Sequence, residues 1–213
     1  MIKCDYNTKT FNFAKIVQDI FNVKDLSKIH ESVTYDKEIP SDASKDQKSS
    51  FHKIFYQTYE NPSDKFLPLY ENFVKHIAST HYPDKKIIFQ RRPTFRVHAP
   101  NNLAVAAWHK DKLYNHSPNE INVYLPITDA FDTNTLWVES EEDKGDYSAM
   151  NANYGQYVIW DGANLNHGNK ENKTNVSRVS CDFRIIFSEN FNYIGTSATQ
   201  KVKMELGHYW EIL

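Results

Sequence analysis

Cysteine, excess charge and long apolar runs are all scarce in this chain of 213 residues. Its two cysteines, Cys4 and Cys181, make no CxxC pair and no disulfide framework, as expected in a reducing cytosol. A formal net charge of −2 leaves no basic excess for binding nucleic acid. The longest unbroken apolar run, residues 103–108, is far shorter than the ~20 residues that span a bilayer. No apolar stretch near the N-terminus has the ~7–15 residues of a secretory signal. We therefore expect a cytoplasmic protein that binds neither nucleic acid nor membranes.

The content of hydrophobic and aromatic residues is typical of one folded domain. Hydrophobic residues make up 40% of the chain and aromatic residues 14%, which is enough apolar surface to form a core and excludes disorder. We expect a single domain over residues 1–213. About residues 1–85 should form a helical support region, about residues 86–190 a β core, and residues 191–213 a C-terminal extension.

The periodicity of apolar residues changes from helical to strand-like near residue 86. Helical spacing predicts a helix over residues 13–21 and a second from Asn61 to Tyr82, with a possible short helix over residues 45–59. Strands are predicted near residues 87–97, 103–109, 120–126, 135–139, 156–160 and 178–187. Many short strands separated by turns favour an antiparallel jelly-roll-type barrel over a parallel α/β sheet. The fold class is therefore mainly β, with N-terminal helices bracing the barrel.

One constellation could bind a metal. In an extended segment His109 and Asp111 point the same way, and a distant His167 could complete a facial triad for Fe(II) that leaves positions open. The His-x-Asp motif alone is weak, because about one His-x-acid match is expected by chance in this composition. The context strengthens it, since His109 follows an apolar predicted strand and His167 follows a strand and a turn.

The last predicted strand alternates strictly between apolar and polar residues. Arg178, Ser180 and Arg184 share one face with Asp182, so this face is either solvated or the polar lumen of a barrel. In a lumen, the guanidinium fork of Arg178 could hold a dicarboxylate. Arg184 lies on the same face and is the rival for that role.

The ordered set of motifs resembles a known enzyme family. His109-x-Asp111, then His167, then Arg178-x-Ser180 eleven residues later, resembles the iron(II)/2-oxoglutarate-dependent oxygenases. The format looks most like their phytanoyl-CoA-hydroxylase-like branch, in particular small bacterial or phage members linked to natural-product and sugar tailoring. The resemblance covers roughly residues 87–187, and the N-terminal helices resemble nothing in that family.

This resemblance implies a double-stranded β-helix, a jelly-roll or cupin-like barrel, with His109, Asp111 and His167 on Fe(II). Arg178 and Ser180 would hold 2-oxoglutarate, and Asn122 and Tyr124 could reach the co-substrate or the substrate. O2 would be the oxidant and a small molecule the substrate. In related enzymes a small residue at the second ligand opens a halide site, so Asp111 favours hydroxylation or desaturation over halogenation.

Two alternatives remain open at the level of sequence. One is a cupin-like metalloenzyme that does not use 2-oxoglutarate, and the other is a non-catalytic jelly-roll binding module. Of these functions, the 2-oxoglutarate-dependent oxygenase alone requires a cation at the position of Arg178. The two enzymes require a tight metal site, whereas the binding module does not.

Overall fold

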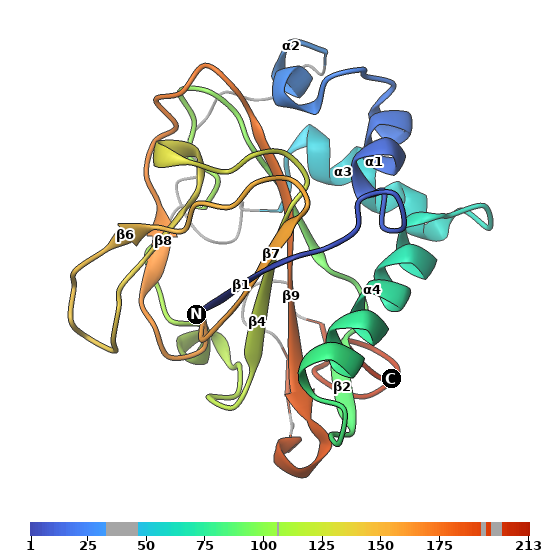
Figure 1. Ribbon diagram of the computed structural model, residues 1–213, viewed down its shortest axis with the longest axis vertical. Helices are drawn as coiled ribbons and strands as arrows, with labels where there is room; N and C mark the ends of the chain where they lie inside the picture. The colour runs from blue at the N-terminus through green and yellow to red at the C-terminus, as the bar shows by residue number, and fades with distance from the viewer. Residues whose placement is uncertain (33–46, 106, 193–194, 197–201) are drawn as a thin grey trace.

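Two antiparallel sheets form the centre of the computed structural model, which describes residues 1–32, 47–105, 107–192, 195–196 and 202–213 (Figure 1). Sheet A has seven strands in the order β1-β7-β4-β9-β2-β10, and β3 also pairs with β9. Sheet B has three strands in the order β6-β5-β8. The strands are β1 (Ile2–Asp5), β2 (Ile87–Gln90), β3 (Thr94–His98), β4 (Ile121–Pro126), β5 (Leu136–Val138), β6 (Ser148–Ala149), β7 (Gln156–Trp160), β8 (His167–Asn169), β9 (Arg178–Phe187) and β10 (Trp210–Ile212).

The predicted strand over residues 87–97 is in fact two strands. The chain breaks at Pro93, which lacks a backbone N–H and has a fixed φ angle, so it cannot continue a sheet ladder. After this break β3 pairs with the first half of β9, whereas β2 pairs with its second half. The predictions of strands that became β4, β5, β7 and β9 are confirmed.

The prediction of a strand over residues 103–109 is wrong. Among its described residues only His109 pairs, in an isolated bridge. The segment is rich in alanine, which has a low preference for strands, and Val105 is its only β-branched residue. The regions outside the predicted β core also contribute strands, because β1 pairs with β7 and β10 pairs with β2.

The predicted helices form with shifted boundaries. Helix α1 (Phe13–Phe21) has the predicted bounds, and α4 (Phe66–His81) begins after Asp64, whose carboxylate accepts the first free backbone N–H groups. Helix α3 (Ser50–Gln57) lies within the possible helix over residues 45–59, of which residues 45–46 are outside the described part. A short α2 (Ile29–Ser32) was not predicted.

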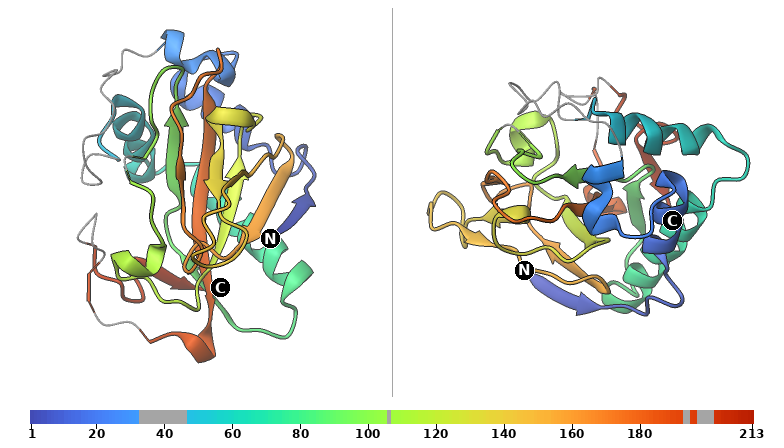
Figure 2. Two further views of the ribbon diagram at one scale, coloured as in Figure 1. Left: turned by 90° about the vertical axis from the view of Figure 1, so that its left-hand side faces the viewer. Right: turned by 90° about the horizontal axis from the view of Figure 1, so that it is seen from above.

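Both faces of β9 are buried, and this arrangement creates the site. Four of its apolar residues belong to the main core with aromatic residues from α1, α3 and α4, namely Val179, Cys181, Phe183 and Ile185. These helices cover one side of sheet A, and β6 and β8 lie on the other side (Figures 1 and 2). The opposite face of β9 carries Arg178, Ser180 and Arg184, all buried. Polar side chains therefore lie between the two sheets.

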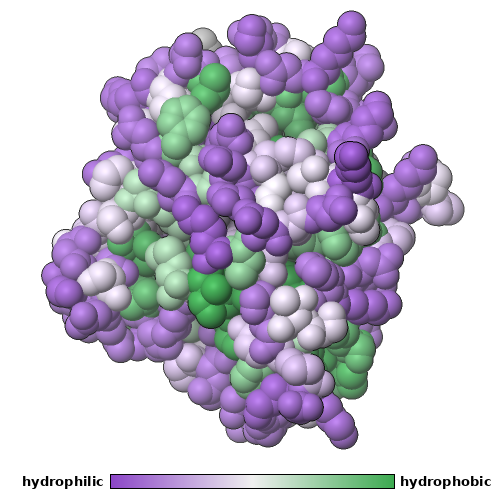
Figure 3. All heavy atoms as spheres, viewed as in Figure 1, coloured by the Kyte–Doolittle hydropathy of each residue, from purple (hydrophilic) through white to green (hydrophobic). Residues whose placement is uncertain are grey.

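The face shown in Figure 3 is mainly hydrophilic, with apolar side chains gathered in small separate patches. No helix among the described residues is long and apolar enough to cross a membrane.

Candidate metal centre

Two histidine-bearing segments lie side by side in antiparallel register. The backbone N–H of His109 donates to the carbonyl of His167, and the N–H of His167 donates back to the carbonyl of His109, both at 2.9 Å. Residues directly opposite in such a pair have their side chains on the same face. The two imidazole rings are accordingly neighbours, with centroids 4.6 Å apart.

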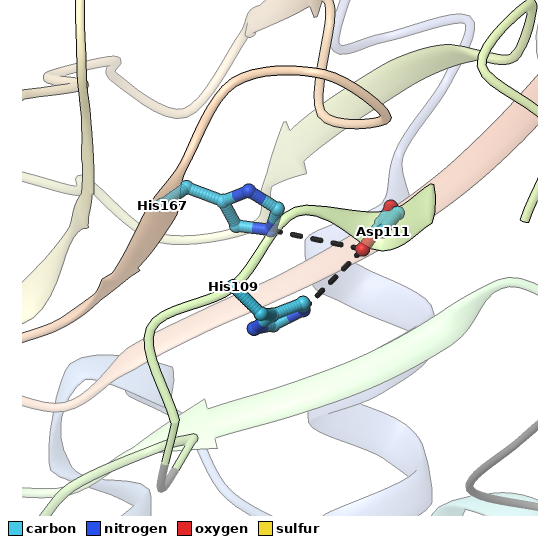
Figure 4. A group of neighbouring side chains, drawn as sticks. All are labelled: His109, Asp111 and His167. Atoms are coloured by element: carbon cyan, nitrogen blue, oxygen red, sulfur yellow. Dashed lines mark ion pairs between the residues drawn. The ribbon is translucent and has the colours of Figure 1, made fainter. Parts of the chain in front are cut away.

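Asp111 joins the two rings from the start of a short 3-10 helix, η4 (Asp111–Tyr114). Its Oδ1 lies 3.3 Å from Nε2 of His109 and 3.8 Å from Nε2 of His167 (Figure 4). One ligand atom from each residue lies within 4.8 Å of the others. Metal bonds of about 2.1 Å set adjacent ligand atoms about 3 Å apart, so the three side chains could hold one divalent metal.

The backbone fixes which nitrogen of each ring could bind a metal. Nδ1 of His109 lies 2.9 Å from the carbonyl of Ala107, and Nδ1 of His167 lies 2.9 Å from the carbonyl of Leu165. A ring that donates from Nδ1 presents the lone pair of Nε2 on its other side. Burial lowers the pKa of His167 to about 4, so this imidazole is neutral and able to bind a metal at neutral pH.

The two carboxylate oxygens of Asp111 have different surroundings: Oδ2 accepts hydrogen bonds from the protein, and Oδ1 faces the histidines. Oδ2 accepts from Nδ2 of Asn122 at 2.8 Å and from Nε and Nη2 of Arg184 at 2.9 and 2.7 Å. Burial acts to raise the pKa of Asp111, but the charge of Arg184 and the side chain of His109 hold it well below its ordinary value. Asp111 is therefore ionised, with Oδ1 directed toward the histidines.

Asn122 was expected to reach the co-substrate or the substrate, and that role stays a prediction. In the structure its amide nitrogen donates to Asp111, a candidate metal ligand. Its Oδ1 is buried and has no hydrogen-bond partner among the described residues. Asn122 is thus a positioning residue for Asp111 that keeps one acceptor available.

Arg184, the predicted rival of Arg178, is held by carboxylates. Besides Asp111, its Nε lies 3.5 Å from Oε2 of Glu120, whose side chain is fully buried. That carboxylate in turn lies 2.8 Å from Nδ1 of His116 and accepts the backbone N–H of Ser117. A buried ion-pair network therefore stands behind the metal ligands. Sequence reasoning missed Glu120, because nothing near it in the chain indicates that its partner is on β9.

Arg178 has the opposite surroundings. It is 1% exposed, and its Nη1 lies 3.2 Å from Ser180 Oγ and 3.4 Å from Tyr124 Oη. Its Nε and Nη2 are buried without hydrogen-bond partners, and no carboxylate of the described residues forms an ion pair with it. A buried cation normally has an anionic partner, and Arg178 has none among the described residues. The predicted residues Tyr124, Ser180 and Arg178 are brought together here.

Trp108, which precedes His109, is 38% exposed. Because side chains alternate along an extended chain, Trp108 points away from the face on which His109 lies. Glu139, by contrast, is 1% exposed and accepts backbone N–H groups.

Comparisons with known proteins show a relative in sequence and similarities in fold to solved structures. No protein-family model matches the chain. The fold resembles that of two structures described as the non-heme monooxygenase ThoJ. Its nickel complex gives a TM-score of 0.51 at 14% identity, covering 90% of this chain and 74% of that one. The apo form gives a TM-score of 0.52 at 12% identity, covering 90% and 75%.

The streptomycin biosynthesis protein StrG of Streptomyces griseus is much more similar in sequence. It is 32% identical over 207 residues, which cover 97% of this chain and 95% of StrG. An alignment of this extent includes the helices, both sheets and every candidate ligand. The chain belongs to the family of StrG.

Proposed function

We propose that this protein is an iron(II)- and 2-oxoglutarate-dependent oxygenase that hydroxylates or desaturates a small molecule. The observation that carries the proposal is Arg178, a buried guanidinium with two unpartnered nitrogens on the same face of β9 as the arginine that holds Asp111. A metal triad alone would suit many metalloenzymes. A triad together with a buried, unpaired cation suits a metal enzyme that also binds an anion.

The three candidate ligands fit iron(II). Two neutral imidazoles and one carboxylate oxygen form a facial triad that leaves positions open for other ligands. His109 and His167 would bind through Nε2 and Asp111 through Oδ1, because the remaining polar atoms of all three residues are engaged by the protein. When bound, iron supplies the activation of O2, and the overall reaction converts 2-oxoglutarate, O2 and R–H to succinate, CO2 and R–OH.

The surroundings of Arg178 fit the distal carboxylate of 2-oxoglutarate. Its Nε and Nη2 can donate to the two oxygens of a carboxylate as a fork, and Ser180 offers a hydroxyl beside them. Tyr124 lies against the guanidinium and limits its movement. In this proposal the protein binds the dicarboxylate by its far end and excludes water from it.

Asp111 favours hydroxylation or desaturation over halogenation. Its carboxylate faces both histidines, in the coordination position that a halide would need.

The proposal also covers the fold and the branch of the family. We propose that the two sheets, with polar side chains between them, are the halves of a double-stranded β-helix, and that the protein belongs to the phytanoyl-CoA-hydroxylase-like branch. We also propose that the protein is a single domain and is located in the cytoplasm.

The names of the similar proteins support the class of reaction and of substrate. StrG is named for streptomycin biosynthesis, and ThoJ is described as a non-heme monooxygenase. We propose a small natural-product intermediate as the substrate, and neither nucleic acid nor membrane as a partner. The cupin-like alternative without 2-oxoglutarate and the non-catalytic module both leave the unpaired nitrogens of Arg178 without a role.

The proposal is tested by adding Fe(II) and 2-oxoglutarate to the protein without oxygen and recording the visible metal-to-ligand absorption. Succinate is then measured after oxygen is admitted. The wild type and the control His208→Ala, which changes an exposed histidine, should both give absorption and succinate, whereas His167→Ala should give neither. A wild type that binds metal but shows no response to 2-oxoglutarate would favour the cupin-like enzyme. A wild type that binds no metal would favour the binding module.

A further inference from the structure

Alternation along the chain turns the neighbours of the metal ligands outward. Trp108 and Lys110 alternate with the inward-facing ligands of their segment, and Asn166 and Gly168 flank the third ligand. A single segment, residues 139–147, contacts three of these outward-facing residues directly and reaches the fourth, Gly168, through the ring of Trp108. We call this segment the outer loop.

The buried end of the outer loop is Glu139, which is 1% exposed. Its Oε1 accepts from the backbone N–H of Asn166 at 2.6 Å and of Asp143 at 3.1 Å, and its Oε2 accepts from that of Gly145 at 3.2 Å. Its own backbone N–H donates to the carbonyl of Asn166 at 3.1 Å. One carboxylate therefore shapes the loop and ties it to the residue before His167.

The other end of the outer loop is Tyr147. Its hydroxyl accepts from Nδ2 of Asn166 at 2.9 Å, and its ring meets Trp108 edge to face with centroids 4.5 Å apart. Trp108 in turn lies directly on Gly168, where an added Cβ would be 2.6 Å from its ring. Tyr147 thus connects the segment before His109 with the segment around His167.

The middle of the outer loop contacts the residue between the two other ligands. Nζ of Lys110 lies 3.0 Å from Glu142 and 2.5 Å from Asp143, and Lys112 also pairs with Glu142. The side chain of Lys110 is 11% exposed although its partners are largely exposed. These acidic residues are matched by lysines, so they act as internal contacts rather than as a free cation site.

We propose that the outer loop sets the spacing of the three metal ligands and thereby the metal affinity of the centre, with Glu139 as its main positioning residue. The inference rests on the proposed function only in requiring that the triad binds metal. The two ligand segments are joined by the reciprocal bridge between His109 and His167. The N–H groups of Asp111 and Lys112 also donate to the carbonyls of Gly162 and Ala163. The outer loop adds side-chain contacts that reach both segments from outside, and these contacts help to set their separation. A loosened loop lets the segments move apart and weakens all three metal bonds together.

The test compares Glu139→Gln with Glu141→Gln, using Co(II) as the probe. The two variants make the same change in the same loop, but Glu141 is exposed, and its side chain pairs with no described residue besides Lys144. A glutamine amide offers one acceptor oxygen in place of two, so Glu139→Gln loses backbone hydrogen bonds of the loop. We expect Co(II) to bind Glu139→Gln about 10–100-fold more weakly, with an altered visible spectrum, and Glu141→Gln like the wild type.

Tyr147→Phe is the second variant, because it removes only the hydroxyl that accepts from Asn166 and keeps the ring contact with Trp108. We expect Co(II) binding about tenfold weaker. A folded Glu139→Gln with wild-type affinity and spectrum refutes the proposal, even if its melting temperature is lowered. If Glu139→Gln does not fold, Tyr147→Phe with unchanged affinity refutes it. A wild type that binds no Co(II) overturns the metal site itself, which distinguishes that failure from the failure of the loop.

Discussion

Replacing Arg178 or Arg184 with methionine should separate co-substrate binding from metal binding. The two arginines are on one face of β9 and are both buried, but among the described residues only Arg184 has carboxylate partners. Arg178→Met should abolish most 2-oxoglutarate affinity and leave metal affinity nearly unchanged. Arg184→Met should weaken metal binding, because Asp111 loses two charge-assisted hydrogen bonds.

The size of each effect follows from which charge is left without a partner. Removing one member of a buried ion pair costs roughly 3–5 kcal/mol, which for 2-oxoglutarate in Arg178→Met corresponds to roughly 100- to 5,000-fold weaker binding. The effect of Arg178→Met on the stability of the free protein should have the opposite sign to its effect on 2-oxoglutarate binding. Arg178 is buried without an anion, so Arg178→Met should leave stability unchanged or increase it. Arg184→Met leaves Asp111 and Glu120 buried without their cation and should lower stability by roughly 3–5 kcal/mol.

Three measurements on the same preparations check these expectations. Anaerobic titration of the Fe(II) protein with 2-oxoglutarate gives co-substrate affinity from the metal-to-ligand absorption. Calorimetric titration with Co(II) gives metal affinity, and urea unfolding of the metal-free protein gives stability. The assignment is refuted if Arg178→Met binds 2-oxoglutarate like the wild type, or if the metal-free variant loses more than about 2 kcal/mol, since either result shows that Arg178 already has its partner.

Three further perturbations probe the same centre. Asn122→Ala removes one of the donors to Asp111 Oδ2 and should weaken Co(II) binding roughly tenfold by calorimetry, and unchanged affinity would contradict its positioning role. Gly168→Ala places a Cβ against the ring of Trp108 and should lower the free energy of unfolding in urea by about 1–3 kcal/mol, and a neutral effect would show that the ring moves freely. Burial lowers the pKa of His98 to about 3, so between that value and its ordinary pKa the unfolded chain binds a proton that the folded one does not. Its contribution to stability is therefore complete above about pH 6.5 and should fall by about 2 kcal/mol by pH 5, a loss that unfolding curves of a His98→Gln variant should lack.

The pattern of apolar residues predicted secondary structure correctly where the structure of a segment depends mainly on its own sequence. The alternation of β9 predicted both its length and its two faces, since a strand between two layers must present different side chains to each. The helix α1 was equally clear, with Phe13, Val17 and Phe21 at helical spacing and all buried. These features need no knowledge of the rest of the chain.

Features that depend on distant partners were not predictable from the sequence. The chain around His109 has the hydrophobicity of a strand, yet it pairs only where His167 meets it, and that register is a property of the whole sheet. The buried position of Glu139 depends on backbone N–H groups of its own loop and of the distant residue Asn166. A glutamate on the surface and one that organises a loop are identical in a sequence read without its fold.

The roles of the two arginines illustrate the same limit. Arg178 and Arg184 are equivalent by alternation, and both could have anchored an anion. What distinguishes them is the loop after His109, which brings Asp111 to Arg184, and Glu120, which precedes the neighbouring strand β4. One guanidinium is thereby used to keep a carboxylate ionised and oriented. The other is surrounded by hydroxyl groups and an aromatic ring and has no carboxylate partner among the described residues, and the paired methionine variants test whether this difference separates co-substrate binding from metal binding.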